Sequence, residues 1–206
     1  MEDEFNIQTR LRFLKMRELI DDVSKKTVLD MGVGENAISN GLNIGKLITL
    51  DGFKHLKPTI VCDLNKDKIP LKSNAVDTVI AGELIEHMIS PVSFLKKCNS
   101  VLKIGGEVII STPNVASLKN RFRVLLGLMP EYCAMAREDG CEDFQTHVKD
   151  FNFGYLKKLL AVSGFEITGK KTNGIIFHSK KIWPLWITPV SFGEILLVRA
   201  KKIKEI

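Results

Sequence analysis

The chain has 206 residues, of which 45% are hydrophobic and 26% are charged. A chain of this size and apolar content can bury a substantial core as one domain, which excludes global disorder. The formal net charge is +6, from 30 basic and 24 acidic residues mixed along the sequence, and this favours ordinary solubilising charge over a nucleic-acid-binding surface.

The cysteines and the apolar segments bear on the compartment. Cys62, Cys98, Cys133 and Cys141 form no CxxC pair, and the N-terminus has no signal-peptide pattern, so we expect reduced thiols in a cytoplasmic protein. The most apolar segment, "IWPLWITPVSFGEILLV", contains two prolines and Glu194 and is shorter than a membrane helix requires. We therefore expect no stable membrane insertion. For the oligomeric state, we expect either a monomer or a homodimer.

The first expected element is an amphipathic helix over residues 5–23. Its apolar side chains recur among charges at close to helical spacing and are Phe5, Leu11, Leu14, Met16 and Leu19. Short β-rich runs follow in the order "KKTVLD", "KLITLD", "PTIVCD", "AVDTVIAG" and "GGEVIISTPN". Between the first two runs, "AISNGLNIG" has room only for a short helix, because Asn40-Gly41 and Gly45 interrupt it.

A helix over "SPVSFLKKCNSVLK" begins at Ser90-Pro91. Strands that alternate with helices, each strand nearly continuous in apolar residues, predict a parallel sheet covered on both faces. Residues 115–147 are less regular, with a possible helix in "SLKNRFRVLLGLM", and we interpret them as an insertion over the sheet edge, where substrate lids are common. The helix "NFGYLKKLLAVSGF", then "EITGKKT" and a last strand "GEILLVRA", complete the chain.

Carboxylates stand at the ends of four successive expected strands, namely Asp30, Asp51, Asp63 and Glu83. The carboxyl ends of parallel strands meet at one edge of a sheet, and ligands bind there where the strand order reverses. A row of acids suits a ligand with hydroxyls and amines, whereas it would repel a bare phosphate.

Glycines in "VLDMGVGEN" mark the loop after the first expected strand. Gly32 and Gly34 let the backbone turn sharply and approach a bulky ligand closely. Asn36 stands where a third glycine often occurs, and asparagine tolerates left-handed backbone better than most residues.

A nicotinamide dinucleotide site is the main alternative. "GVGENA" satisfies the looser form of that fingerprint, and Asp51 lies near the expected distance for a ribose acid. However, Asp30 directly before the glycines would sit badly beside a pyrophosphate, and Asp63 and Glu83 add further negative charge. The chain also lacks a second domain of the size that most dehydrogenases use. An NAD(P)-dependent oxidoreductase and a non-catalytic cofactor-binding module both stay open as alternatives.

Taken in order, these blocks resemble the class I S-adenosylmethionine-dependent methyltransferases, in particular the small-molecule group that includes the ubiquinone-biosynthesis type. The resemblance rests on "VLDMGVGEN", "LITLD", "VCDLNKDKIPLKSNAVDTVIAGELIEHMISP", "FLKKCNSVLKIGGEVIISTPN" and "THVKDFNFGYLKKLLAVSGFEI". It implies an α/β fold with a Rossmann-like, doubly wound, mostly parallel seven-stranded sheet, a C-terminal antiparallel strand and a lid-like insertion. The implied organisation is an N-terminal helix over residues 1–24 and a methyltransferase domain over 25–206, with the insertion at about 115–147.

The resemblance also implies S-adenosyl-L-methionine as the cofactor and S-adenosyl-L-homocysteine as the product. Asp30, Gly32 and Gly34 would lie against the methionine part of the cofactor, and Ala81 and Gly82 would offer backbone near its amine. Asp51 would accept hydrogen bonds from the ribose, and Asp63 with the backbone of Leu64 would face the adenine amine. Because "GFKHLKP" is too short for a full helix, we expect an open adenine side.

Methyl transfer is an in-line displacement, so the protein mainly aligns the reactants and excludes water. A base is needed only if the acceptor must lose a proton. The candidate catalytic residues are His147, which follows the insertion and titrates in a useful range, and Glu83. An orienting or capping histidine would fit the same position, and for His87 we favour a structural role. No metal is implied, because the carboxylates stand on separate strands and no histidine pair has ligand spacing.

The predicted activity is methyl transfer to a small-molecule or carrier-linked acceptor, with no nucleic-acid partner. Apolar side chains in the insertion and the Trp183–Trp186 stretch hint at an apolar or aromatic acceptor. A lid packed on the core would use the same residues, and oxygen, nitrogen and carbon acceptors all stay open.

Overall fold

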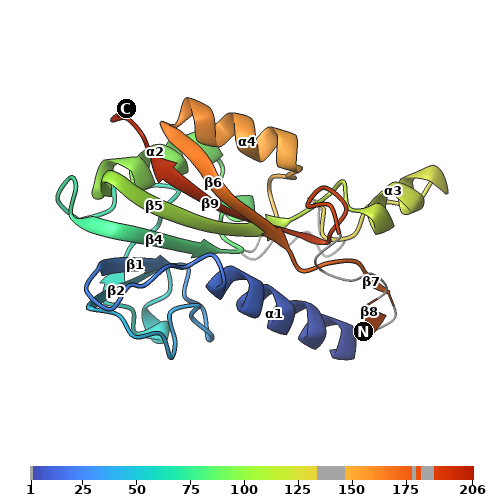
Figure 1. Cartoon of the computed structure of the whole chain (residues 1–206), viewed down its shortest axis with the longest axis horizontal. Coiled ribbons are helices and arrows are strands. Elements are labelled where there is room, and N and C mark those ends of the chain that lie inside the picture. Colours follow the sequence, from blue (N-terminus) through green and yellow to red (C-terminus); the bar gives the residue numbers. More distant parts are fainter. Residues whose placement is uncertain (1, 134–146, 178–179, 182–187) are drawn as a thin grey trace.

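The structure is a computed structural model that describes residues 2–133, 147–177, 180–181 and 188–206. A seven-stranded sheet in the order β3-β2-β1-β4-β5-β9-β6 forms its centre (Figure 1). In chain order these strands are β1 (Thr27–Met31), β2 (Lys46–Asp51), β3 (Ile60–Val61), β4 (Val76–Gly82), β5 (Leu102–Pro113), β6 (Phe165–Thr172) and β9 (Ile195–Lys202). The short strands β7 (Ile176–Phe177) and β8 (Lys180–Lys181) pair with each other in a separate two-stranded sheet.

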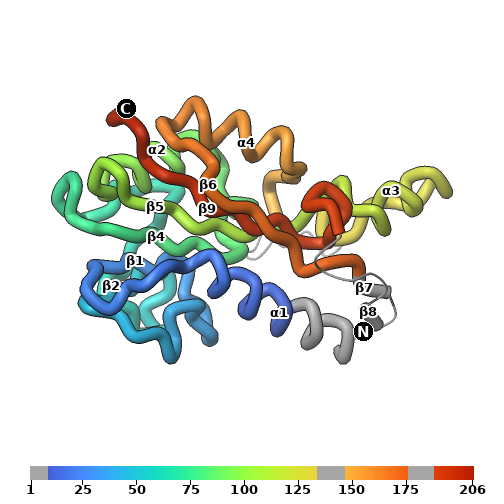
Figure 2. The backbone as a smooth tube through the Cα atoms, in the orientation of Figure 1, coloured from blue at the N-terminus to red at the C-terminus, as the bar shows by residue number. Residues whose placement is uncertain are grey.

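The strand directions confirm the predicted sheet. β1 pairs in parallel with β2 and β4, β2 with β3, and β4 with β5. β9 runs antiparallel to both β5 and β6, so the last strand of the chain lies between two earlier ones, as the red segment in Figure 2 shows. The chain leaves β1 toward β2 and β3 and then crosses to β4 on the other side, so the strand order reverses at the carboxyl ends of β1 and β4.

Helices cover both faces of the sheet (Figure 1). The described helices are α1 (Glu2–Arg17), α2 (Pro91–Val101), α3 (Leu118–Leu125) and α4 (Phe153–Val162), with short 3-10 helices η1 (Lys54–Leu56) and η2 (Ile85–His87). The Ser90 hydroxyl caps α2 by accepting from the amide of Ser93, and Pro91 follows at the first helical position, as expected from the sequence.

Alternate strand residues supply two cores. Val79 and Ala81 of β4 pack in a cluster that includes Leu95 of α2 and Leu160 of α4. Ile80, which points to the opposite face, packs in a second cluster that includes residues of and just after α1. The sheet is therefore buried on both faces, which is why its strands read as nearly continuous apolar runs.

Two predicted helical segments differ in the structure. α1 ends at Arg17 rather than near residue 23, and Leu14 is 51% exposed instead of buried. The apolar spacing continues past Arg17 because Leu19 and Val23 are also buried in the core. These two residues, however, belong to the turns and loop that lead to β1 and not to the helix. Residues 37–45 form turns rather than a short helix, with Gly41 in the left-handed region at φ +77°.

The predicted insertion begins after β5. Its described part includes α3, which extends away from the sheet (Figure 1) and bears Phe122, 58% exposed, and Leu125, 79% exposed. Residues 134–146 lie outside the described part of the chain, as do Cys141, Trp183 and Trp186. The lid role of the insertion and the division of the chain at residue 24 stay predictions.

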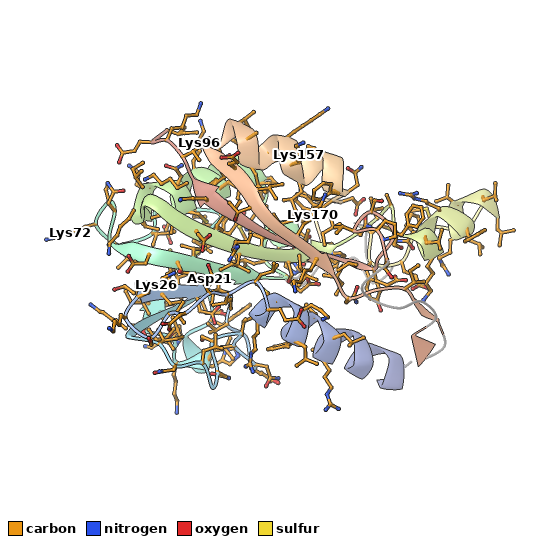
Figure 3. The ribbon with its side chains drawn as sticks, in the orientation of Figure 1. Asp21, Lys26, Lys72, Lys96, Lys157 and Lys170 are labelled. Carbon is orange, nitrogen blue, oxygen red and sulfur yellow. The ribbon has the colours of Figure 1, made fainter. Side chains whose placement is uncertain are left out.

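Charged side chains are spread over the outside of the molecule. Lys72, Lys96 and Lys157 project from separate elements (Figure 3), as expected for dispersed surface charge. Across the described ranges, no helix has the length and apolar character needed to cross a bilayer. Cys62, Cys98 and Cys133 are free thiols. The cytoplasmic location and the oligomeric state stay predictions.

Candidate active site

A cavity of about 430 Å³ lies at the carboxyl ends of β1 and β4, on the face of the sheet that α1 covers. This cavity, called the cleft below, is lined by residues from widely separated parts of the chain, including Arg12, Phe13, Asp30, Gly32, Gly34, Gly82, Glu83, Tyr132, His147 and Ile195. Residues far apart in the sequence therefore meet where the strand order reverses, as the parallel sheet predicts.

The glycine loop has the expected sharp turn. Gly32 and Gly34 have φ values of +67° and +51°, which favour glycine because a side chain would be strained there. A Cβ at Gly32 would also come within 2.9 Å of a methyl group of Leu84, whereas a Cβ at Gly34 would meet nothing within 4 Å. Gly32 therefore allows close packing under the loop, and Gly34 leaves open space above it.

Two buried acids support this loop. Asp30 is 1% exposed and accepts a hydrogen bond from the amide of Ser39 at 3.0 Å, and burial raises the pKa of its carboxyl group. Asp51 is 6% exposed, and its two oxygens accept from the amides of Gly34 at 3.2 Å and Phe53 at 2.9 Å. Both carboxylates keep acceptor positions that these backbone bonds leave unused.

Four of the sequence-predicted residues, Asp51, Asp63, Leu64 and Ala81, are not among those that line the cleft, although Asp51 bonds to the amide of Gly34, which does. Asp63 accepts from the amide of Asn65 at 3.0 Å and pairs with Lys66 at 3.1 Å. The carbonyl of Leu64 accepts from Nζ of Lys97 at 2.7 Å, and Ala81 is fully buried in the core. The fourth strand therefore contributes Gly82 and Glu83 to the cleft, while Asp63 is engaged in a local turn.

Glu83 is held at the cleft by an unusual backbone conformation. Its φ is +50°, a left-handed value that is uncommon for a non-glycine residue and that clusters at functional sites. The Ser111 hydroxyl donates to Oε1 of Glu83 at 2.8 Å, and Arg12 of α1 lies 3.8 Å from the same oxygen. Burial raises the pKa of the Glu83 carboxyl, and the positive charge of Arg12 opposes that shift.

Backbone hydrogen bonds bring the segment that begins at His147 against η2. The carbonyl of Glu86 accepts from the amides of Val148 at 2.9 Å and Lys149 at 3.1 Å. The His147 ring then lies at the cleft, with Nδ1 2.8 Å from the carbonyl oxygen of Tyr132. A carbonyl can only accept, so Nδ1 carries a proton, and in the neutral ring Nε2 has the lone pair.

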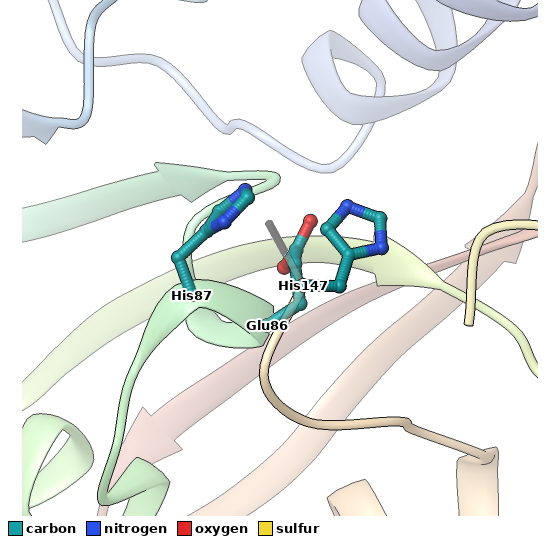
Figure 4. A group of neighbouring side chains, drawn as sticks. All are labelled: Glu86, His87 and His147. Carbon is teal, nitrogen blue, oxygen red and sulfur yellow. The ribbon is translucent and has the colours of Figure 1, made fainter. Parts of the chain in front are cut away.

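His87 lies beside His147, with the ring centroids 5.1 Å apart in an edge-to-face arrangement (Figure 4). The Glu86 side chain points between the two rings and is 1% exposed, and neither of its carboxylate oxygens has a hydrogen-bond partner among the described residues. Burial raises the pKa of this carboxyl well above its usual value, and the negative charge of Glu83 raises it further.

Sequence reasoning did not group these residues. It gave His147 and Glu83 as candidate catalytic residues and His87 as a structural residue, and its expectation of no metal rested on spacing along the chain. Arg12 was also missed, because the N-terminal helix belongs to none of the motif blocks. A burial pattern gives no sign of either arrangement, since both depend on contacts between distant elements.

The comparisons with known proteins agree with the fold. A family model described as "Hypothetical methyltransferase" matches residues 8–174. The ubiquinone biosynthesis O-methyltransferase of Acinetobacter baumannii is 24% identical to this chain over 189 residues, which cover 84% of this chain and 77% of that protein.

Solved structures of methyltransferases share the architecture. A Thermotoga maritima protein described as a "SAM-dependent methyltransferase, possible histamine N-methyltransferase" superposes with a TM-score of 0.67 at 17% identity, covering 98% of this chain and 94% of that one. The 1,6-didemethyltoxoflavin-N1-methyltransferase of Burkholderia thailandensis, solved with 1,6-didemethyltoxoflavin and S-adenosylhomocysteine, gives 0.57 at 13% identity, covering 96% and 79%. At these identities the superpositions establish a shared fold.

Proposed function

We propose that this chain, which belongs to the hypothetical methyltransferase family, methylates an oxygen of a small apolar or aromatic acceptor. The chain is an S-adenosylmethionine-dependent methyltransferase, and the acceptor is the proposed part. The observation that carries this proposal is the cleft, which the glycine loop, Glu83 and His147 line together. It joins a backbone suited to a nucleoside cofactor to groups that can take up a proton.

The residues at the cleft fit the cofactor. S-adenosylmethionine supplies a methyl group on a positively charged sulfur and leaves as S-adenosylhomocysteine. The buried carboxylate of Asp30 offers negative charge to an ammonium group, and the space above Gly34 can accept a bulky group without steric conflict. Asp51 carries its charge beside the same loop, where ribose hydroxyls can donate to it.

The individual cofactor contacts remain proposals. Asp30, Gly32, Gly34 and Gly82 would bind the methionine part, and their presence in the cleft lining supports this. Asp51 would bind the ribose, and its hydrogen bond to the amide of Gly34 supports this. The assignments of Asp63 and Leu64 to the adenine, and of the Ala81 backbone to the methionine amine, rest on the family resemblance.

His147 and Glu83 are the proposed catalytic residues. His147 would take the proton of an acceptor hydroxyl at Nε2 while the oxygen forms its bond to the methyl carbon and the carbon–sulfur electron pair stays on sulfur. Glu83 lies at the same cleft and offers a second proton acceptor, with Arg12 and the Ser111 hydroxyl fixing its position.

An oxygen acceptor with apolar character is supported by two observations. Phe13, Tyr132 and Ile195 give the cleft an apolar wall, which suits an aromatic ring. The Acinetobacter relative is named an O-methyltransferase, and this name supports an oxygen atom as the methyl acceptor.

A test is to measure release of S-adenosylhomocysteine with catechols, phenols and aromatic amines of matched shape. We expect methylation of the hydroxyl compounds, and a loss of about 10²–10⁴-fold in kcat for His147→Ala, the usual contribution of a general base. His55→Ala, which removes an exposed histidine on η1, is the matched control and should keep full activity. Methylation of the amines alone would contradict the proposal.

A further inference from the structure

Glu86, His87 and His147 have the composition of a metal-binding set. Each offers one ligand atom, and these atoms all lie within 4.8 Å of one another. Figure 4 shows the Glu86 carboxylate directed between the two imidazole rings. An imidazole pair with one carboxylate is the ligand set of several catalytic zinc and non-haem iron sites.

No hydrogen bond from the described residues explains the burial of the Glu86 side chain. A carboxylate that is 1% exposed is costly unless it is hydrogen-bonded or paired, yet neither oxygen has a hydrogen-bond partner within the described ranges. A bound cation would give this buried carboxylate a partner. An unpartnered buried acid aimed at two histidines is therefore an observation that points to a ligand.

The arrangement is also held in place without a cation. The two amides that donate to the Glu86 carbonyl fix the segment that begins at His147 against η2. The bond between Nδ1 of His147 and the Tyr132 carbonyl sets the tautomer in which Nε2 has the lone pair, which is how metal-binding histidines are usually oriented.

We propose that Glu86, His87 and His147 bind one divalent cation of the borderline class, such as Zn²⁺, beside the cleft. Mixed nitrogen and oxygen donors favour such ions, whereas Mg²⁺ and Ca²⁺ prefer oxygen alone. Ligands of tetrahedral Zn²⁺ at about 2.0–2.2 Å lie roughly 3.3–3.6 Å from each other, so the three side chains have to close in by about an ångström.

The cation would act on the acceptor, and this part of the inference rests on the proposed function. Three protein ligands leave a coordination position open, and His147 lies at the cleft, so that position would face an acceptor oxygen. With the cation bound, Nε2 of His147 would be a ligand instead of the base, and Glu83, the second proposed proton acceptor, would receive the acceptor proton.

The test is calorimetric titration of Zn²⁺ into the untagged, chelator-treated chain. We expect one ion per chain, at least about 100-fold weaker binding in His147→Ala and His147→Gln, and unchanged binding in His55→Ala, the exposed-histidine control. His147 is half-buried, so these variants should fold, and circular dichroism checks this. An absence of Zn²⁺ binding, or equal binding in the His147 variants, would overturn the proposal.

Two further readings separate the outcomes. Co²⁺ in place of Zn²⁺ should give the visible absorption of a four- or five-coordinate nitrogen and oxygen site, whereas a thiolate charge-transfer band would identify Cys133 as a ligand and overturn the assigned set. S-adenosylmethionine binding is titrated in the same samples. If the chain binds S-adenosylmethionine but not Zn²⁺, the cation site is rejected and the proposed function stands. If the wild-type chain does not bind S-adenosylmethionine, the proposed function is contradicted.

Discussion

Asp51 joins the glycine loop to the proposed ribose site. Its two oxygens accept from the amides of Gly34 and Phe53, and the remaining lone pairs are available to hydroxyls. We expect Asp51→Ala to weaken S-adenosylmethionine binding by about 1–3 kcal/mol, because ribose hydroxyls would lose a charged acceptor. Calorimetry measures this change directly. Asp22→Ala removes an exposed carboxylate elsewhere and should leave affinity unchanged, and an unchanged affinity for Asp51→Ala itself would reject the assignment.

Asp30 makes stability depend on pH. Burial raises its folded-state pKa above the unfolded value, so its contribution to stability is fully present below the unfolded pKa and is lost as pH rises through the raised value. We expect Asp30→Asn, which can still accept from the Ser39 amide, to lose less thermal stability than the wild type as pH increases from about 4 to neutral, a range that begins near the ordinary pKa of an aspartate carboxyl.

The measurement is the melting temperature of the cofactor-free chain across that pH range. The wild-type and Asp30→Asn curves should diverge as pH rises, with the variant more stable at neutral pH. Parallel curves would show that the buried carboxylate does not titrate in this window. The same variant should bind S-adenosylmethionine more weakly, because the proposed partner of the cofactor ammonium is then neutral.

At the scale of the elements, α3 and α4 are each followed by a glycine in the left-handed conformation, but the two glycines have different surroundings. Gly164 follows α4 at φ +79°, and Gly127 follows α3 at φ +73°. A Cβ at Gly164 would come within 2.8 Å of the Lys204 carbonyl oxygen, whereas a Cβ at Gly127 would meet nothing within 4 Å. Both glycines supply the left-handed residue that ends a helix, but Gly164 also lets the C-terminal segment pack against it.

This pair gives a matched test. Gly127→Ala should destabilise the chain by about 1–2 kcal/mol, the usual cost of a left-handed alanine. Gly164→Ala should cost clearly more, roughly 3 kcal/mol or above, because overpacking against backbone adds to that strain. Urea unfolding gives both free energies, and the effect of alanine on the unfolded chain cancels in the comparison. Equal losses of unfolding free energy in the two variants would mean that the C-terminal segment moves away from the new methyl group at no energetic cost.

Sequence predicted the strands better than the ends of the helices. The run "KLITLD" is β2 with the same bounds, since Gly45 and Gly52 flank it and the apolar pattern fills it. α1 ends earlier than its pattern suggests, because buried side chains recur beyond Arg17 in turns that face the same core. Periodicity reports which side chains are buried, and it does not report where the backbone stops being helical.

The same limit applies to the cleft. Acids at strand ends could be placed at one sheet edge from the strand pattern, and Asp30, Asp51 and Glu83 are found there. The meeting of His147 with Glu86 could not be predicted, because it depends on amides after the insertion that donate to the carbonyl of Glu86. No local pattern encodes a hydrogen bond between such distant segments.

At the scale of the whole molecule, the cleft couples elements that are far apart along the chain. The glycine loop follows β1, Glu83 follows β4, and α1 closes the same cavity with Arg12 and Phe13. A ligand bound there contacts elements that meet in the folded state alone, so it should stabilise the folded chain by mass action.

S-adenosylmethionine at about 100 times its Kd should therefore add about 2.7 kcal/mol to the free energy of unfolding. For a chain of this length that corresponds to a rise in melting temperature of roughly 5–10 °C. NADH at the same concentration should give no comparable rise, because Asp30 and Glu83 would repel its pyrophosphate at the glycine loop. Asp51→Ala should show a smaller shift with S-adenosylmethionine, which ties the stabilisation to the proposed ribose contact beside the glycine loop. Equal stabilisation by the two ligands would show that the row of acids does not exclude a diphosphate, and the electrostatic basis of the cofactor assignment would then be wrong.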